Sequence, residues 1–302
     1  MKITHESSVT SEQIDHLGHM NVRFYGVNAR EGTLALLEGL GRSAADTRLV
    51  DVYTRHFTEQ TQGAALEVRT AVLDASPSRI TLYHELHNVE TDVIAATFVH
   101  GLDPTLQPFD HEIVDGLRAD AIRIPAHGAP RSISLDADLL GPAPSLDEAI
   151  DRGLMVRLPR EIGADECDSS GAHLDAHLSS MSWLGLRSNG QASEPTLIDG
   201  PNGEKMGFAA MENRIVVNRR VRLGDSIQTF EAVVKIADKA THRVQWVYDL
   251  DRRDLLHAQE SVSVAFDTIS RRAMSIPAWM SAEDEKRLVP GYLPVPASIQ
   301  GA

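Results

Sequence analysis

The segment Ile14–Gly26, which reads IDHLGHMNVRFYG, decides how the rest of the chain is interpreted. It places a carboxylate, two imidazoles, a carboxamide and a glycine just before a run with helical character. Asp and Asn near the start of a helix are common caps, because their side chains accept hydrogen bonds from unpaired backbone N–H groups. The same groups, held together, could also form an active site. The residue types alone leave both interpretations open.

A long helix and a series of strands are expected around this segment. Residues 2–10 have strand character, and residues 21–40 carry apolar side chains near helical spacing, with Gly39 and Gly41 marking the end. Polar turns then separate the strand-like runs 50–59, 64–74, 79–88 and 92–102. The first part of the chain therefore predicts one long helix and an antiparallel sheet.

The same order of elements returns in the second part of the chain. A strand-like run at 154–162 precedes a helix-like run at 173–187. The further strand-like runs are 213–223, 226–236, 242–250 and 255–267. Short matches, such as Gly63 with Gly224 before a strand, add to the repeated order and indicate an internal duplication.

We therefore predict an α+β fold of two tandem units, each a long helix wrapped by an antiparallel sheet of about five strands, because an apolar helix stripe must be covered. The expected boundaries are 1–103 for the N-terminal unit, 104–150 for a proline-rich linker with a short helix around 110–120, 151–280 for the C-terminal unit and 281–302 for a tail. Edge-to-edge pairing of the units would remove exposed strand edges.

Composition narrows the class of protein. The chain has 302 residues, 42% of them apolar, which is enough for a packed core. A formal net charge of −14 argues against nucleic acid or an anionic membrane as the main partner. No apolar run is long enough to span a membrane or to act as a secretory signal. Cys167 is the only cysteine, so a cytoplasmic location is expected, and its acidic neighbours Glu166 and Asp168 make it a poor nucleophile.

The opening segment is similar to the D-x-x-G-H-V-N-N-x-x-Y pattern of bacterial acyl-CoA thioesterases of the 4-hydroxybenzoyl-CoA thioesterase group. It also resembles the D-x-x-x-H-V-N pattern of plant acyl-ACP thioesterases, whose single chain holds two hotdog units. The resemblance implies that the two units pair as a double hotdog. It also implies hydrolysis of an acyl thioester without a cofactor or metal, with coenzyme A present only as part of the substrate. Leu17 stands where the acyl-ACP enzymes carry Asn, which favours a CoA ester.

The resemblance also assigns roles to individual residues. Asp15 falls on the family's catalytic acid, where it would act as general base on water or as nucleophile. Gly18, His19 and Asn21 fall on the other catalytic positions of the motif. Backbone N–H groups over Gly18–Asn21, at the helix N-terminus, would polarise the thioester carbonyl as an oxyanion hole does.

Further residues are expected to bind the substrate. They are Met20, Tyr25, Glu59, Arg220 and Arg222, of which the two arginines, on one face of a strand, could meet coenzyme A phosphates. In a paired hotdog, residues of one unit line the site of the other. Candidates for that role are His56, Glu59, Gln60 and the residues around Asn213.

The second unit carries a partial copy of the motif, ECDSSGAHLDAHL at Glu166–Leu178. Asp168 and Gly171 keep their spacing, but Ala172 takes the place of His19 and His173 follows one position late. A degenerate second site is therefore expected.

Metal binding is the main competing chemistry. His173, Asp175 and His177 give H-x-D-x-H, and His16 with His19 gives H-x-x-H. Zinc needs a third protein ligand and usually a fourth position, and the sequence does not supply them clearly, so no metal is predicted.

The sequence thus predicts an acyl-CoA thioesterase that acts on a small-molecule substrate. Two alternatives stay open: a hotdog enoyl-CoA hydratase or dehydratase, and a non-catalytic acyl-binding module. A tandem chain already contains one pair of units, so a monomer is sufficient, and a homo-oligomer is equally compatible with the sequence.

Overall fold

The computed structural model describes residues 1–15, 17–175, 178, 197–200, 203 and 205–296. The chain divides into two compact units. The first unit consists of Met1–Pro130 and Asp175–Ser179, and the second consists of Arg131–Leu174 and Ser180–Ala302. The division falls inside the expected linker 104–150, so each half of that segment belongs to one of the units. In the part of the chain that is described, no helix is long and apolar enough to cross a bilayer.

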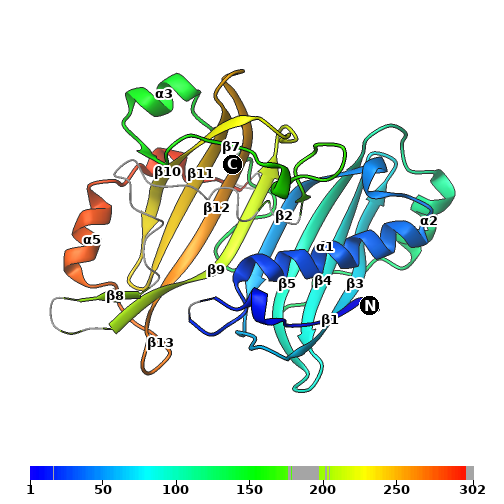
Figure 1. Cartoon of the computed structure of the whole chain (residues 1–302), viewed down its shortest axis with the longest axis horizontal. Helices are drawn as coiled ribbons and strands as arrows, with labels where there is room; N and C mark the ends of the chain where they lie inside the picture. Colours follow the sequence, from blue (N-terminus) through cyan, green and yellow to red (C-terminus); the bar gives the residue numbers. More distant parts are fainter. Residues whose placement is uncertain (16, 176–177, 179–196, 201–202, 204, 297–302) are drawn as a thin grey trace. The chain divides into compact units, whose positions relative to one another are not determined.

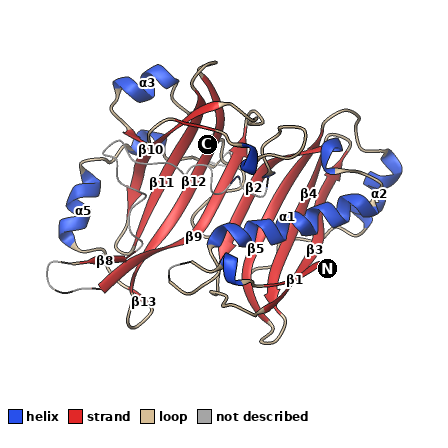
Figure 2. Cartoon of the chain, viewed as in Figure 1, coloured by secondary structure: helices blue, strands red, loops and turns tan. Residues whose placement is uncertain are grey.

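The first unit is an antiparallel sheet with a long helix against one face (Figures 1 and 2). Its elements are β1 (Lys2–Ser8), η1 (Ser11–Gln13), α1 (Val22–Gly39), η2 (Ala44–Asp46), β2 (Thr47–His56), β3 (Ala65–Ser76), β4 (Arg79–Asn88), β5 (Val93–Pro104) and α2 (His111–Ala119). The strand order is β1-β3-β4-β5-β2. Helix α1 contacts β1, β3 and β4. The expected helix and antiparallel sheet are confirmed.

Helix α1 starts and stops where its sequence indicates. Asn21 is the N-cap, and its Oδ1 accepts the N–H of Arg23 at 3.1 Å. Gly41, just past the end, has φ +70°, a left-handed conformation that favours glycine. On the buried face, a Cβ at Gly32 would come within 2.7 Å of Val68 Cγ1. Glycine at this position therefore allows the helix to approach the sheet closely.

A buried polar network lies between α1 and the sheet. Thr33 Oγ1 on α1 is 3.0 Å from His84 Nε2 and 2.8 Å from His100 Nδ1. His84 Nδ1 in turn is 2.8 Å from Thr70 Oγ1. Burial lowers the pKa of His84 to about 3, and the charge of Arg30 adds to the effect. The imidazole is therefore neutral at physiological pH and serves the core rather than acid–base chemistry.

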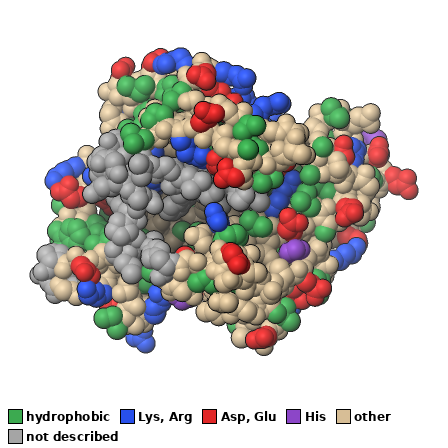
Figure 3. Space-filling model, viewed as in Figure 1, with side chains coloured by type: hydrophobic (Ala, Val, Ile, Leu, Met, Phe, Trp, Pro, Cys, Tyr) green, Lys and Arg blue, Asp and Glu red, His purple; other side chains and the backbone are tan. Residues whose placement is uncertain are grey.

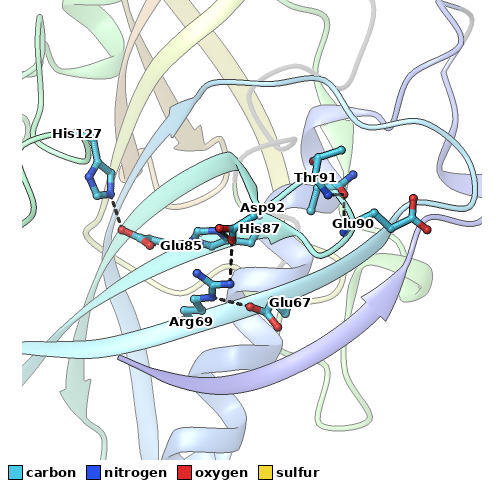
Figure 4. A network of polar contacts seen from close by, with 9 residues as sticks. Glu67, Arg69, Glu85, His87, Glu90, Thr91, Asp92 and His127 are labelled. Atoms are coloured by element: carbon cyan, nitrogen blue, oxygen red, sulfur yellow. Dashed lines mark hydrogen bonds and ion pairs between the residues drawn. The ribbon is translucent and has the colours of Figure 1, made fainter.

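A second network lies on the opposite face of the sheet, since alternate residues of β4 point to opposite sides (Figure 4). Glu85 accepts hydrogen bonds from Tyr83 Oη at 3.0 Å, His87 Nε2 at 2.8 Å and His127 Nε2 at 2.6 Å. Burial acts to raise the pKa of Glu85, but these bonds outweigh it and hold the pKa below its ordinary value. Arg55 Nη1 also donates to the carbonyl of His127, at 2.8 Å. Together they fix the segment around His127 to the first unit.

The second unit repeats the sheet order of the first. Its elements are α3 (Leu146–Asp151), β6 (Met155–Val156), β7 (Arg160–Glu161), η3 (Ala164–Glu166), β8 (Leu197–Asp199), β9 (Lys205–Val217), β10 (Ser226–Ile236), β11 (Ala240–Asp249), β12 (Asp254–Asp267), β13 (Arg272–Ala273), α5 (Ala278–Glu285) and η5 (Pro290–Tyr292). Strands β10-β11-β12-β9 follow one another, with β6 and β7 against β10. This is the order β3-β4-β5-β2 with β1 against β3.

Two expected strands of the second unit differ from the structure. The run 154–162 is interrupted between β6 and β7, where Pro159 has no N–H to donate to a sheet. Strand β9 starts before the expected 213–223 and ends at Val217. Arg220 and Arg222 therefore lie in the loop after β9, and the prediction that they share one strand face is wrong.

The segments expected to flank the second unit are packed onto it. Helix α3 forms within the segment 104–150, which was expected to be a linker. Its capping residue is Ser145, whose Oγ accepts the N–H of Glu148 at 3.1 Å. The C-terminal segment contains α5, which contacts β10, and Tyr292, which is 8% exposed in the core of this unit. The helix expected at 173–187 lies mostly outside the described residues.

Charged side chains of both signs are interspersed on the face drawn in Figure 3. The net charge of −14 is therefore not gathered into one acidic patch on the described part of that face. A local cationic position can exist in this chain despite its total charge.

Candidate active site

The motif forms a tight loop between η1 and α1. Ile14 and Met20 pair across it as an isolated antiparallel bridge. The N–H of Asp15 donates to the carbonyl of His19 at 2.9 Å, and the N–H of Gly18 donates to the carbonyl of Asp15 at 3.0 Å. Gly18 has φ +84°, which explains the glycine in the motif.

Asp15 occupies the centre of this loop and is half-buried. Its Oδ1 accepts the N–H of Leu17 at 2.8 Å and, more weakly, the N–H of His19 at 3.4 Å. None of the described residues donates a hydrogen bond to Oδ2. One carboxylate oxygen thus shapes the loop, as a cap would, while the other remains available for chemistry.

Fewer backbone N–H groups are available for the expected oxyanion hole than the sequence suggested. The N–H groups of Met20 and Asn21 donate to the carbonyls of Gln60 at 2.7 Å and Gln13 at 2.8 Å. The N–H of Gly18 is also used, within the loop itself. Of the positions Gly18–Asn21, only the His19 N–H makes a long bond, so it is the one most readily shared with a substrate carbonyl.

His19 faces a carboxylate from the same unit. Its Nε2 lies 3.4 Å from Glu59 Oε2, and the two side chains are 26% and 52% exposed. Glu59 follows β2, so the sheet brings it to the loop from about forty residues away along the chain. Glu59 therefore lies beside His19 within its own unit.

Tyr25 and Met20, which were expected to bind the substrate, are buried in the structure. They are 3% and 2% exposed and pack in the core of the first unit. Tyr25 Oη donates to the carbonyl of Thr58 at 3.3 Å and accepts the N–H of Gln60 at 3.0 Å. Burial raises the pKa of Tyr25 to about 12, and the carboxylates of Glu59 and Asp15 contribute to the rise.

The second motif folds into the same loop. The N–H of Asp168 donates to the carbonyl of Ala172 at 2.9 Å, and the N–H of Gly171 donates to the carbonyl of Asp168 at 3.0 Å. Asp168 Oδ1 accepts the N–H groups of Ser170 and Ala172, at 2.8 and 3.1 Å. Gly171 has φ +75°. The backbone of the proposed site is therefore present twice.

Asp168 matches Asp15, but the side chains of His19 and Asn21 have no counterpart in the second loop. Ala172 stands at the position of His19, and Leu174 at that of Asn21. His173 takes the place of Met20, because its N–H donates to the carbonyl of Val221 as that of Met20 donates to Gln60.

The same correspondence places Arg220 at the position of Glu59, one residue before the accepting carbonyl. Arg220 Nη2 lies 3.8 Å from Asp168 Oδ2. Arg222 is exposed in the same loop, where its N–H donates to Asp225 Oδ2 at 2.9 Å. Both arginines thus lie beside the second loop, within their own unit.

The described residues give no support to a metal site or to a cysteine nucleophile. Asp175 of the H-x-D-x-H pattern forms a buried ion pair with Arg30 at 2.7 Å, and His177 lies outside the described residues. The described residues contain no cluster of three His, Cys, Asp or Glu side chains suited to a metal. Burial raises the pKa of the Cys167 thiol, with Glu166 and Asp168 adding to the rise, so it is a weak nucleophile.

Two supporting residues, Thr58 and Asn88, were not expected from the sequence, whereas Gln60 was a candidate for lining the other unit's site. Thr58 and Gln60 contact Tyr25, and Asn88 Nδ2 at the end of β4 donates to Gln60 Oε1 at 2.8 Å. No spacing rule links these positions to the motif, since only the sheet brings them together. His56, another candidate, packs edge-on against Tyr25 at 5.3 Å, and burial lowers its pKa to about 4.

Comparisons with known proteins agree with this fold. A search of curated proteins finds no match. Among solved structures, the chain is similar to one described as an oleoyl thioesterase from Lactobacillus plantarum (TM-score 0.61, 10% identity, 86% of this chain and 94% of that chain). It is also similar to a 12:0-ACP thioesterase from Umbellularia californica (0.61, 8%, 87% and 93%) and an acyl-ACP thioesterase from Bacteroides thetaiotaomicron (0.58, 10%, 86% and 96%).

At these identities the solved structures establish the fold alone. The sequence itself provides a separate observation, because residues 9–102 match the model of the thioesterase-like superfamily. This range contains the complete first loop, Tyr25 and Glu59. Residues 9–102 therefore carry the pattern of the thioesterase-like superfamily, and the resemblance of this chain to the hotdog thioesterases is confirmed.

Proposed function

We propose that this chain hydrolyses an acyl thioester at the loop Asp15–Asn21, with coenzyme A as the expected carrier. The observation that carries the proposal is the convergence of three groups on that loop: Asp15 Oδ2, the long-bonded N–H of His19, and the His19 imidazole beside Glu59. A thioester requires activation of water, charge stabilisation on the carbonyl oxygen, and protonation of a thiolate. These three groups supply one function each.

In the first step, Asp15 Oδ2 accepts a proton from water as the oxygen adds to the carbonyl carbon. Direct attack by the carboxylate, followed by hydrolysis of the anhydride, is the other route open to the same oxygen. In both routes the negative charge collects on the former carbonyl oxygen. The His19 N–H can turn from its 3.4 Å contact with Asp15 Oδ1 to that oxygen.

In the second step the tetrahedral intermediate collapses and the carbon–sulfur bond breaks. The leaving thiolate takes a proton, and the acyl group leaves as a carboxylate. We assign the transfer of this proton to His19, whose Nε2 lies 3.4 Å from Glu59 Oε2. Asn21 acts through its cap on α1, which holds the loop against the helix.

The carrier is inferred from the sequence alone. Leu17 replaces the Asn of acyl-ACP thioesterases, and its N–H serves only to hold Asp15 Oδ1 in the described structure. A hydrogen-bonding side chain is thus missing at a position those enzymes use. This favours a CoA ester over an acyl carrier protein.

The test is thiol release from a panel of short, medium, long and aromatic acyl-CoAs, with acyl-ACP of matched chain length beside them. Turnover of some ester with release of one thiol per acid formed is expected. A folded protein that binds acyl-CoA but releases no thiol from any member would contradict hydrolysis. A higher kcat/KM for acyl-ACP than for acyl-CoA would contradict only the proposal that coenzyme A is the carrier.

A single turnover in H₂¹⁸O tests for the anhydride route in which water attacks the Asp15 carboxyl carbon. If Asp15 is a general base, label enters the acid product and never the protein. Label found in the Asp15 carboxylate by peptide mass spectrometry would show the anhydride route instead.

A further inference from the structure

The phenol of Tyr25 holds the chain on both sides of Glu59. Its Oη donates to the carbonyl of Thr58, before Glu59, and accepts the N–H of Gln60, after it. The two distances are 3.3 and 3.0 Å, and the ring is 3% exposed. Glu59 itself is 52% exposed, and the peptide groups on both of its sides are the ones that Tyr25 holds.

We call the two hydrogen bonds of Tyr25 Oη the clamp, and Gln60 adds further bonds to it. Gln60 accepts the N–H of Met20 through its carbonyl at 2.7 Å, and its Oε1 accepts Asn88 Nδ2 at 2.8 Å. Gln60, which follows Glu59, is thus bonded to the loop through its carbonyl, to Tyr25 of α1 through its N–H, and to the end of β4 through its side chain. These bonds join the carboxylate to the loop that carries His19.

The second loop shows what happens without this phenol. Leu178 follows Asp168 at the interval at which Tyr25 follows Asp15. The backbone bonds of the second loop are nevertheless the same, including the N–H of His173 to the carbonyl of Val221 at 3.0 Å. A tyrosine is therefore not required to fold this loop.

The phenol and the reactive pair are absent together from the second loop. Leu178 replaces Tyr25 where Ala172 replaces His19 and Arg220 replaces Glu59. The loop that lacks the pair therefore also lacks the phenol. We infer that Tyr25 is a positioning residue, which fixes Glu59 beside His19 through the two peptide groups that flank Glu59.

This inference deepens the proposed hydrolysis and rests on it. Tyr25 touches no substrate, so its loss acts on the chemical step and not on binding. Tyr25→Phe keeps the ring and removes both bonds. We expect kcat to fall about 10-fold with KM changed by less than about twofold, since a small displacement of a catalytic group is costly.

The decisive measurement is a double-mutant cycle with Glu59→Gln. If Tyr25 acts only through Glu59, then Tyr25→Phe lowers kcat by less than about twofold once Glu59 is already Gln. Independent, multiplying effects of the two substitutions would overturn the inference. So would an unchanged kcat in Tyr25→Phe alone.

Tyr83→Phe is the matched control. Tyr83 is a fully buried tyrosine of the same unit, and its Oη donates to Glu85 at 3.0 Å on the face of the sheet opposite α1. The Tyr83→Phe variant also loses a buried hydrogen bond of a tyrosine. The Tm of this variant should therefore fall, while its kcat stays at the wild-type value. An equal loss of kcat in both variants would mean that destabilisation, and not positioning, explains Tyr25→Phe.

Crystal structures of wild type and Tyr25→Phe separate this inference from the proposed function. The separation of His19 Nε2 and Glu59 Oε2, 3.4 Å with the phenol present, should widen while the bond from Leu17 N–H to Asp15 Oδ1 is kept. An unchanged separation overturns the positioning role even if the enzyme is active. A widened separation in a protein that hydrolyses no thioester sustains the positioning geometry and rejects hydrolysis.

Discussion

Asp15 and Asp168 hold the same hydrogen bond in the two halves of the chain. The N–H of each donates at 2.9 Å to the carbonyl four residues later, which belongs to His19 in one loop and Ala172 in the other. The loop therefore forms with either His or Ala at that later position. Because backbone and chemistry are separated in this way, the second loop is an internal control for substitutions in the first.

Asp15→Asn should lower kcat by at least about 100-fold, the loss expected when a general base is removed. The fold should survive, because an Asn Oδ1 can still accept the N–H of Leu17. Thiol release and a thermal melt check both parts. Asp168→Asn is the control, since it alters the equivalent turn where His19 and Glu59 have no counterpart, and its kcat should be that of wild type. A large loss in Asp168→Asn would place chemistry in the second loop.

Gly18→Ala should destabilise the protein by about 1 kcal/mol, because an L-residue at positive φ carries a cost of that order. Space is not the reason, since nothing lies within 4 Å of a Cβ built at Gly18, where φ is +84°. Gly116, within the helix α2, has equally open surroundings without a positive φ. Gly116→Ala should therefore raise the Tm. Equal effects of the two substitutions in chemical denaturation would contradict the backbone explanation.

Thr33→Val should cost about 2 kcal/mol, because a buried polar group left without a partner loses its solvation. Thr33 Oγ1 serves two imidazoles, those of His84 and His100. Thr47 provides the comparison: it is fully buried, and its Oγ1 has no hydrogen-bond partner among the described residues. Thr47→Val should be neutral or stabilising. Urea unfolding of both variants decides whether the network beneath α1 stabilises the first unit.

Glu260→Gln should stabilise the protein at pH 8 and have little effect near pH 4. Burial raises the pKa of Glu260 to about 7, with Arg214 opposing and Glu212 adding to the rise. A carboxyl whose folded pKa lies above its unfolded value costs stability as pH rises, because ionisation favours the unfolded chain. The penalty begins above the ordinary value of 4.5 and is complete above about 7, where it reaches about 3 kcal/mol.

Glu231→Gln should show the opposite dependence on pH. Burial acts to raise the pKa of Glu231, but Arg243 and Gln245 outweigh it and keep the pKa below the ordinary value. Its ionised form therefore stabilises the folded state above 4.5, and this contribution is lost as pH falls through the folded pKa. Thermal melts of both variants from pH 4 to 8 test the pair. Parallel curves for the two would show that their surroundings do not differ in this way.

Local signals sufficed for much of the fold. The strands 79–88 and 226–236 match β4 and β10 residue for residue, because polar turns bound each apolar run. The cap at Asn21 and the glycine at 41 fixed the ends of α1 in the same local manner. Expectations failed where a single residue or the packing decided the outcome: Pro159 divided one strand, and the segment 104–150 was docked onto the units by side chains far away in sequence.

The loop is encoded locally, since Asp15, Gly18 and Asn21 each act through bonds to residues a few positions away or through their own φ. Its surroundings depend on the folded sheet. Glu59 reaches His19, and Tyr25 becomes a buried clamp, because strand register in a sheet sets which distant residues meet. Short-range hydrogen bonding is encoded in spacing, whereas a contact across a sheet depends on every strand between its partners.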